Sequence, residues 1–269
     1  MGKIVAAGGT SHILMSPKGC EESAARVVNG IAELGRRLKE ARPDVLVIIT
    51  SDHMFNINLS MQPRFVVGIA DSYTPMGDMD IPRDLVPGSR EVGRAIALQA
   101  DEDGFDLCQA EEYSLDHGIM IPILFMGMKE IPVVPVIVNI NTDPIPSARR
   151  CVALAESIRQ AIEKRTPDGC RVAVVGAGGL SHWLCVPRHG EVSEKFDHMV
   201  MDELVRGNAE KLVAMGNEAI IDQGGNAGVE ILTWIMAAVA SEASSGEKVF
   251  YEAMTQWFTG IGGMEFHVK

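Results

Sequence analysis

The chain has 269 residues, of which 46% are hydrophobic and 22% charged, and its 36 acidic and 24 basic side chains give a formal net charge of −12. This length and composition are typical of a folded globular protein with a sizeable core, and they argue against intrinsic disorder. Because the charge is strongly negative and no run is rich in Lys or Arg, we expect neither nucleic acid nor an anionic membrane surface as a partner.

The cysteine content indicates a reducing compartment. The five cysteines form no CxxC pair and are odd in number: Cys20, Cys108, Cys151, Cys170 and Cys185. They predict free thiols and a cytoplasmic protein. The first residues, MGKIVAAGGT, lack the pattern of a signal peptide, and no apolar run approaches the roughly 18 residues that cross a bilayer, so we expect no membrane segment.

Five apolar runs of strand length, rich in Val and Ile, follow one another along the chain, at residues 3–8, 45–50, 65–70, 133–138 and 171–175. Their hydrophobicity is nearly continuous, which predicts strands that are covered on both faces. Helical patterns lie between them. One has apolar residues three and four apart from Val27 to Ala41 and ends before Pro43, and another, at 151–162, follows the capping candidate Ser147.

The region from 194 to 240 also has a helical pattern, with breaks near Gly207 and at the turn Gly224-Gly225-Asn226. Strands that alternate with helices predict an α/β sandwich. No internal repeat or low-complexity linker divides the chain. We therefore expect a single α/β domain over 1–269, with a central, largely buried mixed β-sheet flanked by helices.

Four of the seven histidines end similar motifs: His12 in GGTSH, His53 in VLVIITSDH, His117 in EEYSLDH and His182 in RVAVVGAGGLSH. In open α/β sheets the ligand crevice lies beyond the carboxyl ends of the strands, where several loops meet. Any one of these histidines alone would more simply be a hydrogen-bonded loop residue, but their recurrence predicts one shared pocket. The polar residues that directly precede them are candidates for orienting the imidazoles: Ser11, Asp52, Asp116 and Ser181.

A metal ion is a natural reason to bring several neutral imidazoles together. The zinc motif HExxH is absent and the cysteines are not paired, whereas two histidines and one carboxylate form the facial triad typical of non-haem iron(II). Glu230, in GGNAGVEILTWIM, is the candidate carboxylate, about one turn into an apolar helix that begins at Gly225 or Asn226. A salt-bridged core glutamate is the alternative interpretation.

The segments GTSHIL, TSDH, SLDHGIMIPI, VVGAGGLSHWL and NAGVEILTWIM occur in this order over nearly the whole chain. In this order and at these intervals they resemble the class III extradiol ring-cleavage dioxygenases, the family that includes protocatechuate 4,5-dioxygenase β subunits and 2,3-dihydroxyphenylpropionate 1,2-dioxygenases. The resemblance implies a non-haem Fe(II) enzyme that opens a catechol-type aromatic ring with O2 in aromatic-compound catabolism. It makes His12, His53 and Glu230 the iron ligands and His117 and His182 the acid–base pair, with His182 as base and His117 as acid, or the reverse.

Two other functions stay open at this point: a non-catalytic interaction module of the same fold, and a zinc hydrolase built on the same five residues. The identity of the substrate is also undecided. The candidates are protocatechuate or gallate, a 2,3-dihydroxyphenylpropionate-like acid, and a smaller hydroxylated heteroaromatic such as a dihydroxypyridine. Candidate partners for a substrate carboxylate are Arg64, Arg149 and Arg188. Some members of the family work with a small helical subunit, but this chain has no appended helical domain, so we expect a homo-oligomer.

Overall fold

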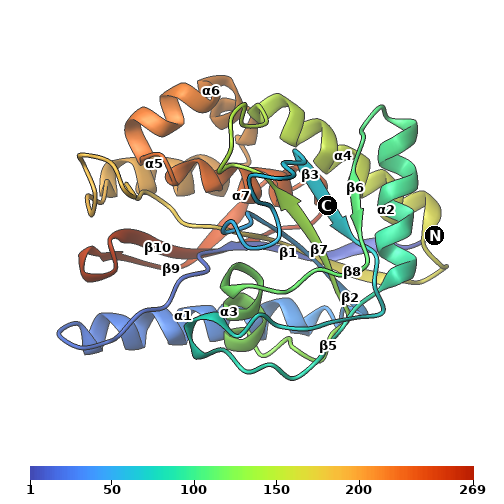
Figure 1. The fold of residues 1–269 in the computed structure, drawn as a ribbon, viewed down its shortest axis with the longest axis horizontal. Coiled ribbons are helices and arrows are strands. Elements are labelled where there is room, and N and C mark those ends of the chain that lie inside the picture. The colour runs from blue at the N-terminus through green and yellow to red at the C-terminus, as the bar shows by residue number, and fades with distance from the viewer.

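A computed structural model describes residues 1–269, and its centre is one eight-stranded β-sheet (Figure 1). The strands of this sheet are β1 (Lys3–Thr10), β2 (Val45–Thr50), β3 (Phe65–Gly68), β6 (Cys108–Ala110), β7 (Val133–Val138), β8 (Arg171–Ala177), β9 (Gly246–Met254) and β10 (Thr259–Phe266). Hydrogen-bonded neighbours follow the order β6-β3-β7-β2-β8-β1-β10-β9. Strands β7, β2, β8 and β1 are parallel, whereas β10 is antiparallel to β1 and β9, and β3 is antiparallel to β7. The sheet is therefore mixed, as predicted.

Helices cover both faces of the sheet. They are α1 (Glu21–Glu40), α2 (Arg90–Glu102), α3 (His117–Phe125), α4 (Ala148–Arg165), α5 (Glu194–Val205), α6 (Ala209–Gly224) and α7 (Ile231–Ala240). In Figure 1, α1 and α3 lie below the sheet, and α4, α5, α6 and α7 lie above it. A short ribbon of β4 (Ser72–Tyr73) and β5 (Val86–Pro87) and the 3-10 turns η1 (Asp78–Asp80), η2 (Gly228–Glu230) and η3 (Thr255–Trp257) complete the fold. The predicted sandwich with a central sheet flanked by helices is confirmed.

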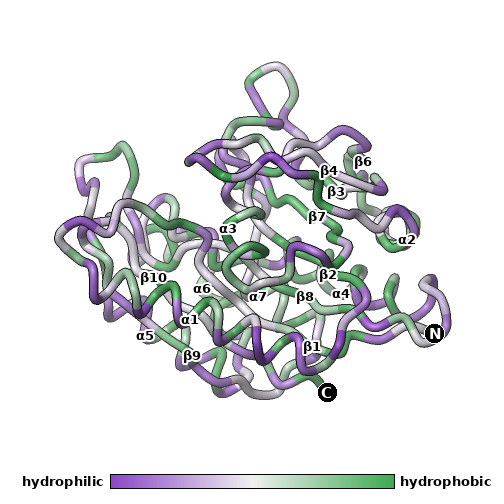
Figure 2. The backbone as a smooth tube through the Cα atoms, turned by 90° about the horizontal axis from the view of Figure 1, so that it is seen from below, coloured by the Kyte–Doolittle hydropathy of each residue, from purple (hydrophilic) through white to green (hydrophobic).

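The core consists of two hydrophobic clusters, one on each face of the sheet. Along β2, Val47 and Ile49 belong to the cluster with α4 and α7, and Leu46 and Ile48 belong to the cluster with α1 and α3. Side chains of a strand point alternately to its two faces, so a strand buried on both faces must be apolar at every position. Figure 2 shows this for β7, which is largely green in the middle of the molecule.

The helices form largely where the sequence predicts them. Helix α1 buries one face that includes Val27, Ile31 and Leu38, and the Ser147 hydroxyl caps α4 by accepting from the Arg150 N–H at 3.3 Å. The region 194–240 divides into α5, α6 and α7, with φ of +71° at Gly207 and +99° at Gly225. Both predicted breaks are confirmed. Neither φ value is readily adopted by a residue with a side chain.

The C-terminal hairpin β9–β10 was not expected from the sequence. Most residues of β9 are only half-buried, and β10, TGIGGMEF, contains three glycines, so neither has the continuous apolar run of the central strands. The short strand β6 and the ribbon β4–β5 lack such a run as well. None of the helices combines the length and hydrophobicity that crossing a lipid bilayer requires.

The parallel strands bring their carboxyl ends to one edge of the sheet. Thr10 at the end of β1 pairs with Ala177 at the end of β8, and Ile49 near the end of β2 pairs with Gly176. The loops after these three strands therefore leave the sheet at the same level, and they carry His12, His53 and His182. This edge is the expected ligand crevice of an α/β sheet.

Candidate active site

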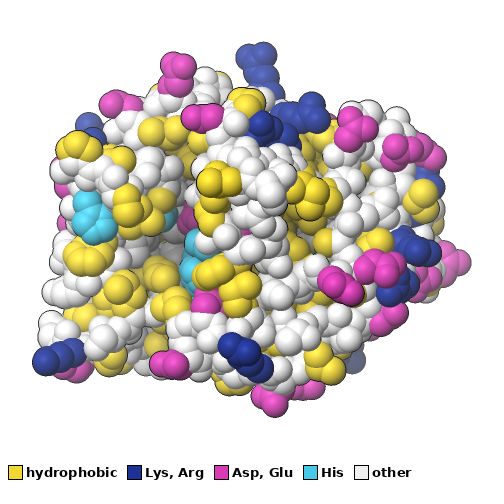
Figure 3. All heavy atoms as spheres, in the orientation of Figure 1, with side chains coloured by type: hydrophobic (Ala, Val, Ile, Leu, Met, Phe, Trp, Pro, Cys, Tyr) yellow, Lys and Arg dark blue, Asp and Glu magenta, His cyan; other side chains and the backbone are white.

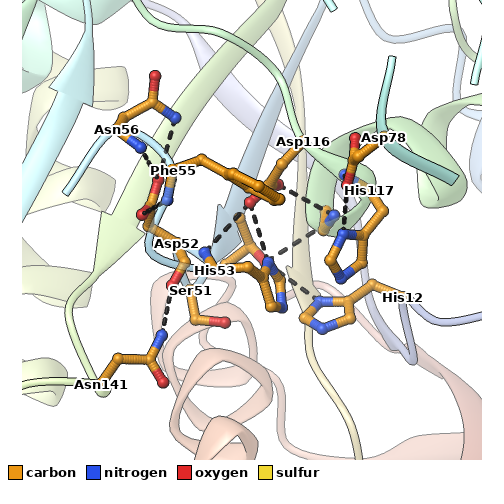
Figure 4. Close-up of polar contacts among 12 residues, drawn as sticks. His12, Ser51, Asp52, His53, Phe55, Asn56, Asp78, Asp116, His117 and Asn141 are labelled. Atoms are coloured by element: carbon orange, nitrogen blue, oxygen red, sulfur yellow. Dashed lines mark hydrogen bonds and ion pairs between the residues drawn. The ribbon is translucent and has the colours of Figure 1, made fainter. Parts of the chain in front are cut away.

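All five predicted site residues lie in one pocket. Its lining includes His12, His53, His117, His182 and Glu230. Three of the histidines come from the loops after β1, β2 and β8, but His117 does not follow a strand of the sheet directly: it is the first residue of α3. The expectation that the four histidines share a pocket is confirmed, and Figure 4 shows His12, His53 and His117 turned toward one another.

Hydrogen bonds fix the orientation of His53 and His117. The Nδ1 atom of His53 lies 2.9 Å from Asp116 Oδ2, and that of His117 lies 2.6 Å from Asp78 Oδ2. The Asp78 carboxylate also accepts from the backbone N–H of His117 at 3.2 Å. A carboxylate carries no proton, so each imidazole donates from Nδ1 and leaves the Nε2 lone pair free.

His12 and His182 have the same tautomer for different reasons. The His182 Nδ1 lies 2.9 Å from the carbonyl oxygen of Leu180, which can only accept. The His12 Nδ1 lies 3.3 Å from the Thr50 hydroxyl, which itself donates to the Gly118 carbonyl at 3.4 Å and so accepts from the imidazole. All four histidines therefore hold Nδ1 against the protein and leave Nε2 free.

Glu230 lies among these Nε2 atoms. Its Oε2 is 3.4 Å from His12 Nε2 and 3.8 Å from His182 Nε2, and its Oε1 is 3.8 Å from His53 Nε2. The Ser51 hydroxyl donates to Oε1 and the Gly179 N–H donates to Oε2, both at 2.6 Å. Each oxygen thus has one protein donor and one side that faces imidazoles.

The electrostatic surroundings keep Glu230 ionised and His12 neutral. Burial disfavours the charged carboxylate, but the imidazoles of His12, His182 and His53 and the Gly179 N–H outweigh it and lower the pKa of Glu230 to about 2. Burial lowers the pKa of His12 to about 3. Burial also opposes protonation of His53, but the hydrogen bond that His53 donates to Asp116, together with the negative charges of Asp116, Glu230 and Asp52, outweighs burial and raises the pKa of His53.

Glu230 begins the helix instead of lying one turn inside it. It is the last residue of η2 and directly precedes α7, which is buried along nearly its whole length. The carboxylate therefore lies at a helix N-terminus, where the aligned peptide dipoles favour negative charge. The prediction of a buried glutamate near the start of an apolar helix is confirmed, with a shift of about one turn.

Two overlapping groups of side chains could hold a metal ion. The ligand atoms of His12, His53 and His117 all lie within 4.8 Å of one another. The alternative group keeps His12 and His53 and takes Glu230, at 3.4 and 3.8 Å, as the third member. His117 and Glu230 form no ion pair with each other, and His117 pairs with Asp78 instead.

None of the four residues that directly precede the histidines bonds the imidazole of its own neighbour, and only Asp116 bonds an imidazole at all, so the expectation is wrong for the other three. The Ser11 hydroxyl accepts from the Gly262 N–H, and the Ser181 hydroxyl donates to Asp197. Asp52 accepts from the Tyr113 hydroxyl and from its own loop. Asp116 does bond an imidazole, but that of His53, which is distant in sequence. Neighbours in an extended loop point in different directions, so adjacency does not give contact.

Asp78 was missed by sequence reasoning. It lies in η1, between Gly77 with φ of +81° and the consecutive residues Met79 and Asp80, with φ of +52° and +59°. Two successive non-glycine residues in the left-handed region are uncommon, and such strain gathers at functional sites. Nothing in the letters PMGDMD marks this turn as a partner of a histidine almost 40 positions away.

The remaining wall of the pocket is mostly apolar, with Asn141 and Thr259 as its polar side chains. The cavity has a volume of about 240 Å³, and the apolar part of the wall is formed by Ile13, Met15, Leu184, Ala227, Trp257 and Phe258. Figure 3 shows histidine side chains in a hollow with hydrophobic side chains beside them. None of the predicted carboxylate partners lines it. Arg64 donates to the carbonyls of Thr142 and Asp143, Arg188 pairs with Glu191, and Arg149 lines a separate surface hollow.

Comparison with known proteins agrees with this arrangement. The family model described as the catalytic LigB subunit of aromatic ring-opening dioxygenase matches residues 4–262. The chain belongs to this family. It is 26% identical to a 2,3-dihydroxyphenylpropionate/2,3-dihydroxicinnamic acid 1,2-dioxygenase of Rhodococcus sp, with 93% of each chain covered, and 24% identical to the enzyme of that name from Photorhabdus laumondii, with 91% of this chain and 90% of that one covered.

Among solved structures, the crystal structure of an uncharacterized protein from Escherichia coli K12 superposes with a TM-score of 0.64 at 14% identity, over 98% of this chain and 100% of that one. This likeness shows the fold. Family membership shows that this LigB-family protein is an extradiol ring-cleavage dioxygenase, which favours an enzyme over a non-catalytic interaction module. The predicted family and enzyme class are confirmed.

Proposed function

We propose that the enzyme binds one iron(II) ion through His12, His53 and Glu230, and that His182 and His117 move protons while a catechol-type ring is opened with dioxygen. The observation that carries this proposal is the ionised, buried carboxylate of Glu230 beside the free Nε2 atoms of His12 and His53. Two imidazoles and one carboxylate are the ligand set of non-haem iron(II) oxygenases.

The distances fit a shared metal ion. Two ligand atoms that each lie about 2.1 Å from one metal are about 3 to 3.5 Å apart, depending on the angle at the metal. The separations of 3.4 Å from Glu230 Oε2 to His12 Nε2 and of 3.8 Å from Glu230 Oε1 to His53 Nε2 are close to this range. A carboxylate also offsets the charge of the cation, so Glu230 is the better third ligand.

Bound iron(II) would supply neighbouring coordination positions for the diol and for dioxygen. The protein supplies the proton transfers. His182 is suited to take a proton from a substrate hydroxyl, because its Nε2 carries a free lone pair and its Nδ1–H is held by the neutral Leu180 carbonyl. The His182 Nε2 lies 3.8 Å from the Glu230 carboxylate, one of the three proposed metal ligands.

His117 is better suited to return a proton. Its Nδ1–H donates to the Asp78 carboxylate, which provides a counter-charge when Nε2 is protonated. The Asp78 carboxylate can form a charge-assisted hydrogen bond with His117 while His117 carries the proton that it delivers, whereas the partner of His182 is a neutral carbonyl. The hydrogen-bond partners therefore support His182 as base and His117 as acid.

The proposal is tested by loading the protein with iron(II) or zinc(II) under anaerobic conditions and adding catechols before exposure to dioxygen. We expect dioxygen uptake and a yellow ring-opened product with iron only. Hydrolase activity of the zinc form without dioxygen uptake by the iron form would instead favour the zinc hydrolase.

We treat 1–269 as one catalytic domain. A cytoplasmic location is supported by the cysteines, all of which are free thiols. The homo-oligomer stays a prediction that sedimentation of the purified protein at micromolar concentration checks, and purification from the native host would detect a small helical subunit.

A further inference from the structure

We propose that the ring substrate carries no carboxylate and is a small, uncharged ortho-diol. This inference rests on the proposed function and names its substrate class. It starts from the two ends of the pocket. The diol would bind at the imidazoles and Glu230, so any other substituent of the ring must face the opposite wall.

That wall offers no cation. None of the fourteen lining residues is Lys or Arg, and the only carboxylate among them, Glu230, is itself negative. Arg188, the arginine closest in sequence to Leu184, lies over the Trp183 ring at 4.0 Å and pairs with Glu191. An unpaired carboxylate that leaves water for an apolar surface is strongly disfavoured.

The polar side chains of the wall offer little in place of a cation. The Trp257 N–H donates to the Ser16 carbonyl at 2.9 Å, and the Thr259 hydroxyl donates to the Gly260 carbonyl at 3.0 Å. Both groups therefore use their only hydrogen within the protein. The Asn141 amide nitrogen donates to the Asp52 carbonyl and keeps one hydrogen, while its Oδ1 makes no hydrogen bond within the protein. A substrate carboxylate at this wall would therefore find one neutral donor, the second amide hydrogen of Asn141, beside acceptor oxygens such as Asn141 Oδ1. An uncharged ring would pack against Ile13 and Ala227.

The size of the pocket agrees with a single ring. Its volume of about 240 Å³ lies below the roughly 300 to 1,000 Å³ of pockets for drug-sized ligands. The rim side chains Met15, Leu184 and Phe258 are 44%, 40% and 39% exposed, so the apolar character continues to the opening. Asn226 holds Leu184 in place, because its side chain accepts from the Leu184 N–H at 2.9 Å and donates to the Leu184 carbonyl at 3.0 Å.

The test compares two matched pairs of substrates with the iron(II) protein: 4-methylcatechol against 3,4-dihydroxybenzoate, and 3-propylcatechol against 3-(2,3-dihydroxyphenyl)propionate. Within each pair the ring and the position of the substituent are the same, and a carboxylate replaces a methyl group; in the second pair two methylene groups separate it from the ring. We expect kcat/KM from dioxygen uptake to be at least about tenfold higher for the uncharged member. A carboxylated member that is used equally well or better would overturn the inference.

Anaerobic calorimetry with the same four compounds separates this inference from the proposed function. Tighter binding of the uncharged members, without any dioxygen uptake afterwards, would contradict the dioxygenase chemistry proposed for these residues but support the substrate class. Absence of binding by all four would overturn both.

A charge placed on the rim provides a second test. Leu184→Arg adds a cation where the backbone is held by Asn226, and Leu184→Gln is the uncharged control of comparable length. We expect Leu184→Arg, but not Leu184→Gln, to raise kcat/KM for the carboxylated member of each pair relative to its match by about tenfold. An unchanged ratio in Leu184→Arg would argue against an apolar wall that faces the substituent.

Discussion

Asp116 connects His53 to the helix that begins with His117. Its Oδ2 accepts from His53 Nδ1 at 2.9 Å, while its Oδ1 accepts from the Gly118 N–H at 3.0 Å and so caps α3. One carboxylate therefore sets the positions of a proposed metal ligand and of a proposed acid. The ring centroids of His53 and His117 are 3.9 Å apart as a result.

Asp116→Asn should weaken metal binding. The amide cannot accept from His53 with the strength of a carboxylate, and loss of such a partner typically costs 10- to 100-fold, roughly, in metal affinity. Iron(II) titration under anaerobic conditions measures the change. The control is Asp106→Asn, an exposed aspartate outside the site, and equal affinities in the two variants would show that Asp116 does not orient the ligand.

Asp78→Asn should reduce turnover and leave iron binding in place. Without the carboxylate, the charged form of His117 loses its counter-charge and its Nδ1 partner, so we expect kcat to fall by at least about tenfold. Steady-state dioxygen uptake and iron content are measured on the same samples. Asp80→Asn, two positions along the same strained turn and exposed, is the matched control. A similar loss in both variants would indicate a general disturbance of η1.

Asp197→Asn should change how stability depends on pH. Burial raises the pKa of Asp197 from 3.8 to about 6, although the Ser181 N–H and the Tyr251 hydroxyl hydrogen-bond to it. The folded protein therefore binds this proton more tightly than the unfolded chain does. The stabilisation that protonated Asp197 adds to the free energy of unfolding is greatest below pH 4 and is lost as the pH rises through 6. The free energy of unfolding of the variant, relative to that of the wild type, should therefore rise by up to about 3 kcal/mol between pH 4 and pH 7. Urea unfolding at four pH values measures this difference, and a constant difference would contradict it.

The central strands and helices could be predicted because burial produces a local sequence pattern. A strand buried on both faces is a continuous apolar run, and a helix packed on the sheet has apolar residues three and four apart. Strand β2 and strand β7 have the predicted bounds, since all their residues are buried and all except Thr50 are apolar. The hairpin β9–β10 has no continuous apolar run, because it lies at one edge of the sheet and is partly exposed.

The site likewise contains residues that the sequence predicts and hydrogen-bond partners that it does not predict. His12, His53, His182 and Glu230 could be found because strand ends and a helix start converge at one edge of a parallel sheet. Their hydrogen-bond partners could not, because Thr50, Asp78 and the Leu180 carbonyl are brought into contact by the tertiary fold, and a partner across the fold leaves no pattern in either segment.

The choice between Glu230 and His117 as the third metal ligand is the central claim, and iron content after anaerobic loading tests it most directly. Glu230→Gln and His117→Ala are compared with the wild type, with circular dichroism to confirm that each variant is folded. The account predicts about one iron per chain in the wild type and in His117→Ala, and loss of iron in Glu230→Gln. Retention of iron in Glu230→Gln together with its loss in His117→Ala would contradict the account and assign the metal to the three histidines.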